Sequence, residues 1–134
     1  MAANRMNEIS PKRAYQEAAV SGANPMRLTV MLYEQIMQDV ARADQALKDH
    51  RPDLCAQEIG HAVAVIGYLQ ATLRPEAGAD VVRNLGRFYT MLREKLMEAQ
   101  VRSSHSILEQ LRQQLVEVHE AWAKVEAEAV AMVQ

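Results

Sequence analysis

The sequence predicts an all-α protein, an antiparallel up-down-up-down four-helix bundle preceded by a short N-terminal helix or arm. Apolar residues recur at spacings of three and four along four long stretches, and only short breaks separate these stretches. No segment alternates apolar and polar residues as a strand does. Glycine (5), proline (4) and aromatic residues (4%) are too scarce for the turns and pleated surfaces of a β-sandwich or barrel.

The chain of 134 residues is expected to fold as one domain, 1–134, because a chain of this length buries enough surface to need no disulfide or metal. Ser10-Pro11 is a helix-start signal, so a short helix can form shortly before Gly22. We expect residues 1–22 to form a mobile N-terminal arm and residues 24–130 to form the bundle.

The first long helix is expected over residues 25–49. Asn24 is a good N-cap, and Pro25 stands at the first helical position, where its missing N–H has no cost. Pro52 disfavours helical conformation in the residue before it and so ends this helix. The next helix is expected over residues 53–73.

The second half of the chain predicts two more helices. Residues 74–78 contain proline and glycine and form a break, after which a helix is expected over 79–101. A cluster of serines follows, and Ser106 with Glu109 has the spacing of a capping box. The last helix therefore begins near Ser106 and runs to about residue 130.

Two of the helices show a narrow apolar seam, which is typical of helices that cross near 20°. In the helix over 79–101 the seam consists of Val81, Leu85, Phe88, Leu92, Leu96 and Ala99. In the last helix it consists of Leu108, Leu111, Leu115, Val118, Trp122 and Val125.

Charge and hydropathy exclude several classes of protein. Fifteen basic and seventeen acidic residues give a net charge of −2, and no basic cluster marks a nucleic-acid surface. No stretch is long and apolar enough to cross a membrane, and the first ten residues lack the apolar core of a secretory signal. We therefore expect a cytoplasmic protein that neither binds nucleic acid nor inserts into a membrane.

Residues that could carry chemistry are few and scattered. Cys55 is the single cysteine and lies on the apolar arc of its helix, which predicts a buried thiol. Glu58 and His61 have the Glu-x-x-His spacing of di-iron helices, but such a site needs a second copy of the motif, which is absent from the sequence. No phosphate-binding loop or nucleophile motif occurs. We expect no enzyme activity, no cofactor and no metal.

The helix over 25–49 carries more apolar surface than one bundle contact needs. Its core-facing arc extends sideways over a second set of apolar residues, so that about 220° of the helix is apolar. Either the N-terminal arm or a fifth helix covers the excess, or it forms a groove for a partner. The residues of this second set that we assign to the groove are Val30, Tyr33, Met37 and Ala41.

The helix over 53–73 carries small residues along one face, and two of them are glycines that lower its intrinsic stability. A small face indicates close approach of another backbone. That backbone belongs either to a neighbouring helix of the bundle or to a helix from elsewhere. The residues of this face that we assign to the groove are Gly60, Ala64, Gly67 and Ala71.

Several short motifs follow one another in order along the chain. They are Ala14-Tyr15-Gln16, Val20, Asn24-Pro25, Leu28, Val30-Met31-Leu32-Tyr33-Glu34, Ala71-Thr72-Leu73, Gly78, Asn84-Leu85, Tyr89 and Leu111 through Trp122. Their order and spacing resemble the FliS family of flagellin-specific export chaperones, over about residues 14–125. The chain departs from the family pattern at Glu34-Gln35, where the family has Asp-Gly, and at Asn24, where it has Ser.

The resemblance implies a chaperone that binds the C-terminal segment of unpolymerised flagellin. That segment is disordered in the monomer and becomes helical on the chaperone, a case of helix-in-groove recognition with folding on binding. Covering it prevents premature polymerisation and keeps flagellin competent for flagellar type III secretion. Other flagellar export components are further possible partners. In this interpretation Tyr15 and Val20 lie in the N-terminal arm, which covers the excess apolar arc when no client is bound.

Two alternatives remain open from the sequence. A generic helical protein–protein adaptor without an export role has the same architecture, and a ferritin-like metal protein is a third class. An exposed apolar helix face can also drive formation of a homodimer.

Overall fold

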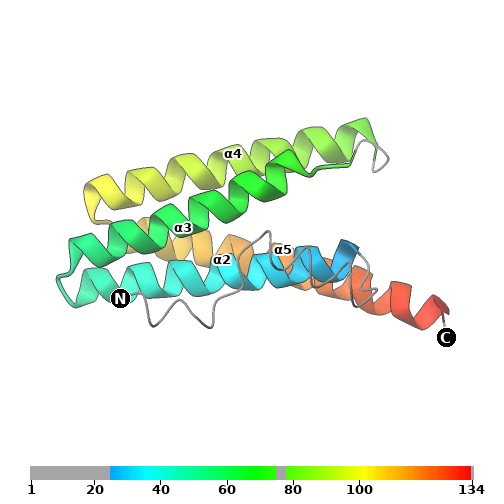
Figure 1. The fold of residues 1–134 in the computed structure, drawn as a ribbon, viewed down its shortest axis with the longest axis horizontal. Helices are drawn as coiled ribbons and strands as arrows, with labels where there is room; N and C mark the ends of the chain where they lie inside the picture. The colour runs from blue at the N-terminus through cyan, green and yellow to red at the C-terminus, as the bar shows by residue number, and fades with distance from the viewer. Residues whose placement is uncertain (1–24, 75–77, 134) are drawn as a thin grey trace.

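The computed structural model describes residues 25–74 and 78–133, and all the regular structure in these two ranges is α-helix. The helices are α2 (Pro25–Lys48), α3 (Pro52–Ala71), α4 (Ala79–Arg102) and α5 (His105–Val133). Consecutive helices run in opposite directions, as Figure 1 shows. The predicted all-α, antiparallel four-helix bundle is confirmed for this part of the chain, whereas the predicted arm, residues 1–22, lies outside the described residues.

The ends of α2 and α4 explain the two tight turns between antiparallel neighbours. After α2, His50 takes a left-handed conformation with φ 55°, and the amide of Arg51 donates to the Ala46 carbonyl at 2.8 Å. After α4, Ser103 does the same with φ 51°, and the amide of Ser104 donates to the Ala99 carbonyl at 3.0 Å. Both ends are Schellman motifs, which satisfy the last carbonyls of a helix and reverse the chain.

The beginning of α5 differs from the predicted capping box. The Ser104 hydroxyl accepts a hydrogen bond from the amide of Ile107 at 3.1 Å, so Ser104 is the N-cap and the helix begins at His105. The predicted cap at Ser106 is therefore wrong by two residues. Ser104 was not distinguished from Ser106 because the serines are close together and each is a good cap.

The helix α2 makes the most extensive contacts in the bundle. It packs most extensively against α3 and α5, while α4 completes the bundle by packing against α3 and, less closely, against α5. Figure 1 also shows the C-terminal turns of α5 projecting beyond the other helices. Because α2 packs extensively against both of its neighbours, it needs a wider apolar arc than a helix that packs closely on one side only.

The core is fully closed toward the α2–α3 and α4–α5 turns and less so toward the other end. Near the turns, Ala46, Cys55 and Ala99 are buried. At the opposite end, seam residues that were predicted to be interior are only partly covered among the described residues. These are Leu85, Phe88, Val118 and Trp122, which are partly buried, and Val81 and Val125, which are each 44% exposed.

Candidate partner-binding surface

Tyr33 lies in the middle of the core. Its hydroxyl donates a hydrogen bond of 2.9 Å to the hydroxyl of Tyr89 in α4, and the ring centroids are 6.3 Å apart. Burial raises the pKa of both phenols, so both stay neutral across the physiological range. The indole of Trp122, in α5, is a second polar neighbour of the Tyr33 hydroxyl.

The predicted groove positions Val30 and Tyr33 are therefore interior. Both side chains are buried, so neither is available to a partner in this conformation. The physical reason is the second neighbour of α2, since part of the apolar arc that seemed to be in excess packs against α5 as well as α3. For these two residues the arc is buried in the bundle.

Met37 and Ala41 lie on the side of α2 that faces α5. The Met37 side chain is partly buried against the core. Ala41 is exposed and lines a shallow hollow of about 280 Å³ between the two helices, together with Leu108, Glu109 and Arg112. These two positions remain candidates for contact with a partner.

The small residues of α3 lie on its outer face. Gly60, Ala64 and Ala71 are exposed and Gly67 is half-buried. A Cβ built on Gly60 or Gly67 would meet no described atom within 4 Å. The glycines therefore do not serve close packing between the described helices, which was one of the two alternatives for this face.

The eight predicted positions thus form no single continuous groove. Two are interior, two lie toward α5, and four follow the outer face of α3. Tyr15 and Val20, assigned to the arm, lie outside the described residues. The observation that supports a partner surface best is the open, small-residue face of α3.

A buried polar cluster between α2 and α3 was missed by the sequence analysis. The carboxylate of Asp39 is fully buried, lies 2.6 Å from Nδ1 of His61, and accepts a 3.1 Å hydrogen bond from Gln35. Burial raises the pKa of Asp39, while the His61 contact lowers it and the nearby Glu58 carboxylate raises it further. His61 had been placed on a polar edge, and the sequence contains no signal that Asp39 would face it.

Two more histidines meet carboxylates of α2. Nδ1 of His105, at the start of α5, lies 2.6 Å from Asp44, and Nε2 of His119 lies 3.4 Å from Glu34. Together with His61, three histidines from α3 and α5 contact carboxylates of α2. Each of these pairs joins α2 to a different point on its neighbours.

The described residues offer no further chemistry of the kinds considered above. Within residues 25–74 and 78–133, no three histidine, cysteine or acidic residues form a group that could hold a metal ion. Cys55 is buried, and burial raises the pKa of its thiol. No helix among the described residues is long and apolar enough to span a membrane.

Comparison with known proteins identifies the family. The family model described as "Flagellar protein FliS" matches residues 7–129 of the chain. The chain belongs to the FliS family. The match includes all of α2, α3 and α4 and most of α5, so it covers both helices that carry the exposed candidate positions.

Individual FliS proteins are similar over most of their length. The flagellar secretion chaperone FliSB of Pseudomonas aeruginosa is 33% identical over 106 residues, which is 79% of this chain and 84% of that protein. The flagellar secretion chaperone FliS of Salmonella typhimurium is 26% identical over 114 residues, and that of Bacillus subtilis is 24% identical over 113 residues. In both cases 84% of each protein is covered. This FliS protein is therefore a flagellar export chaperone.

Proposed function

We propose that this FliS protein binds the C-terminal segment of unpolymerised flagellin, prevents its premature polymerisation and keeps it competent for export. The chaperone then acts in the cytoplasm, before its client leaves the cell, and needs neither catalysis nor a cofactor. Family membership and the names of its relatives support the chaperone role. The flagellin segment is the client that the sequence resemblance implies.

The outer face of α3 is the surface that supports this proposal best. Its small side chains leave backbone accessible over several turns, and no described atom approaches Gly60 or Gly67. A client helix can come closer to such a face than to one lined by long side chains, because its own side chains fill the missing volume. Met37 and Ala41, on α2, extend the proposed contact to a second side of the bundle.

The client must bury enough apolar surface to offset the cost of its own ordering, roughly 2–5 kcal/mol or more. A long segment that wraps over several faces meets this requirement better than one pocket does. The hollow between α3 and α4 accords with this mode, because it is open to solvent and does not form an enclosed pocket.

The substitution Gly67→Leu tests the face. Because the position is open and helical, we expect the free energy of unfolding to stay the same or rise by under about 1 kcal/mol. Affinity for flagellin is expected to fall by about ten-fold or more, since overpacking a close contact costs about 1–3 kcal/mol. Ala127→Leu, which adds similar bulk to an exposed position of α5, is the matched control and should leave binding unchanged.

The client itself is tested by co-purification with the cognate flagellin and with a flagellin that lacks its C-terminal segment. We expect the full-length flagellin to co-purify and the truncated one not to. Equal binding of both would show that the client segment is wrongly chosen. Retained binding by a stable Gly67→Leu variant would remove the α3 face from the site without affecting the choice of client.

A further inference from the structure

The outer face of α4 carries a second stripe of residues, separate from the seam that packs into the core. Its members recur at spacings of 4, 3, 4, 3 and 4, which keeps them on one side of the helix. All six are exposed, and they are Arg83, Arg87, Thr90, Glu94, Met97 and Val101. We call this set the α4 stripe, and it extends over about 27 Å of helix.

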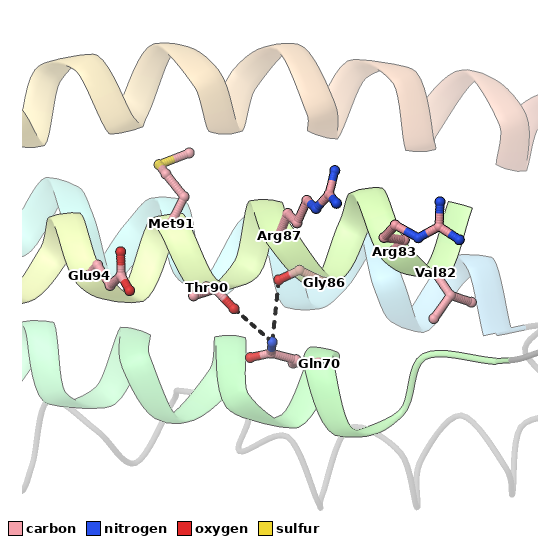
Figure 2. A pocket seen from close by; sticks show the side chains of 8 residues that line it. All are labelled: Gln70, Val82, Arg83, Gly86, Arg87, Thr90, Met91 and Glu94. Carbon is pink, nitrogen blue, oxygen red and sulfur yellow. Dashed lines mark hydrogen bonds between the residues drawn. The ribbon is translucent and has the colours of Figure 1, made fainter. Parts of the chain in front are cut away.

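The first half of the stripe borders a hollow of about 420 Å³, shown in Figure 2. One wall comes from α3, where the Gln70 amide donates to the Gly86 carbonyl at 3.3 Å and to the Thr90 hydroxyl at 3.0 Å. The Gln70 side-chain oxygen accepts a further bond from Arg93 at 3.1 Å. These three bonds hold the Gln70 side chain against α4. This wall of the hollow is therefore part of the contact between α3 and α4.

The cations at this hollow are only weakly neutralised. Arg83 pairs with Asp80 at 3.3 Å, but both side chains are more than half exposed, and such pairs contribute little. Arg87 has no acidic partner within salt-bridge distance among the residues that the structure describes. The hollow therefore presents two guanidinium groups, one turn apart, to an incoming ligand.

The last two residues of the stripe are apolar, and they follow Glu94, an exposed carboxylate that also lines the hollow. Met97 is 50% exposed and Val101 is 83% exposed, and the two are one turn apart. Most large apolar side chains of the described bundle are covered, so a neighbouring pair at this level of exposure is unusual for this molecule. The stripe thus carries two cations at its N-terminal end, one carboxylate in the middle and two apolar side chains at its C-terminal end.

We propose that the α4 stripe is a docking site for an acidic amphipathic helix of a second protein, distinct from the flagellin client. Carboxylates on consecutive turns of that helix pair with Arg83 and Arg87, which favour bidentate geometry. Apolar residues two to three turns further along pack on Met97 and Val101. The charge pattern of the stripe places the acidic end of the partner helix beside the N-terminal half of α4.

A synthetic helical peptide with this pattern is the probe. It carries two glutamates four residues apart and, beyond them, two leucines four residues apart, on one face. Amide chemical shifts of the isotope-labelled chaperone are followed during titration. We expect shifts confined to α4 and to Gln70, and an affinity that falls as salt is raised. A second peptide with lysines in place of the glutamates should bind at least ten-fold more weakly.

Variants of the chaperone test each half of the stripe. Arg87→Glu and Met97→Ser are both at exposed positions, so the melting temperature should remain close to that of the unmodified protein. Each should weaken the acidic peptide at least five-fold. Lys124→Glu makes the same change of charge at an exposed position of α5 and should leave the affinity unchanged.

Four results would overturn the proposal. The first is shifts spread over other helices, and the second is an equal loss of affinity in the Lys124→Glu control. The third is competition, in which bound flagellin blocks the peptide or Arg87→Glu abolishes flagellin binding, because the stripe would then belong to the client site. Shifts of the same residues that depend on chaperone concentration alone would identify a second copy of this chain, and not another protein, as the occupant.

Discussion

At the scale of single residues, the Tyr33–Tyr89 pair shows how a polar group is accommodated in the centre of the bundle. Each hydroxyl is buried, and the 2.9 Å hydrogen bond between them satisfies both at once. A buried hydroxyl that loses its partner costs more than the bond itself contributed, because it stays desolvated. The pair therefore acts as a unit, and α2 and α4 are fixed against each other through it.

A double-mutant cycle tests this pair. We expect Tyr33→Phe and Tyr89→Phe each to lower the free energy of unfolding by about 1–2 kcal/mol. The double variant should lose less than the sum of the two, because no hydroxyl is left unpaired. Urea denaturation of the four proteins measures the coupling. Strictly additive losses would mean that the hydroxyls do not depend on each other.

Asp39 is the second residue whose burial has a measurable consequence. Its pKa in the folded protein is raised above the ordinary value of 3.8, chiefly by burial, so the folded state binds a proton more readily than the unfolded state. Between these two values the folded chain holds more protons, and the contribution of Asp39 to stability falls as pH rises through this window. This is opposite to the behaviour of a surface carboxylate in an ion pair.

Asp39→Asn removes this titration. We expect the free energy of unfolding of the unmodified protein, minus that of the variant, to decline as pH rises above the ordinary pKa of 3.8. Chemical denaturation at a series of pH values measures the difference, and Asp53→Asn, at an exposed position in the first turn of α3, is the control. A difference that rises with pH would mean that His61 outweighs the effect of burial.

At the scale of helices, the features that could be predicted from the sequence are those set by local rules, such as where a helix begins and ends. The start of α2 at Pro25 and the break around His50 were predicted, because proline and capping residues act within one turn. The start of α5 was misplaced by one residue and its cap by two, since several serines satisfy the same rule. The burial of single side chains was harder to predict. Tyr33 was assigned to a partner surface, because the width of an apolar arc does not reveal which neighbouring helices cover it.

Gly60 and Gly67 make a prediction about the stability of α3. Neither has a neighbour where a Cβ would stand, and neither has a positive φ. Replacing either by alanine should raise the free energy of unfolding by up to about 1 kcal/mol, because alanine is the better helix former. Gly78, with φ 103°, is the contrast, and Gly78→Ala should destabilise. Thermal denaturation of the three variants measures the sign of each effect.

At the scale of the whole molecule, the end of the bundle opposite the two tight turns is incompletely covered by the described helices. Val81 and Val125 are each 44% exposed there, although both occupy seam positions. The predicted arm, residues 1–22, lies outside the described residues, so its position over the apolar arc of α2 stays a prediction.

Removing residues 1–22 tests this. We expect the truncated protein to stay helical and to bind more of a dye that fluoresces on apolar surfaces, because the predicted arm would no longer cover the apolar arc of α2. Affinity for flagellin should be kept or increased if the arm competes with the client. Unchanged dye fluorescence would contradict the covering role, and lost flagellin binding in a folded protein would place the arm in the binding surface.

The position of α2 between α3 and α5 has a consequence for the order in which the molecule opens. Hydrogen bonds, buried polar contacts and three histidine–carboxylate pairs converge on this helix, whereas α4 packs less closely against α5. Native-state exchange of amide protons with deuterium should be slowest in the middle of α2 and faster along α4, which would separate first as a unit. In that partly open state the protein would still present three packed helices, and the inner surface of α4 would become the next apolar face available to a bound chain.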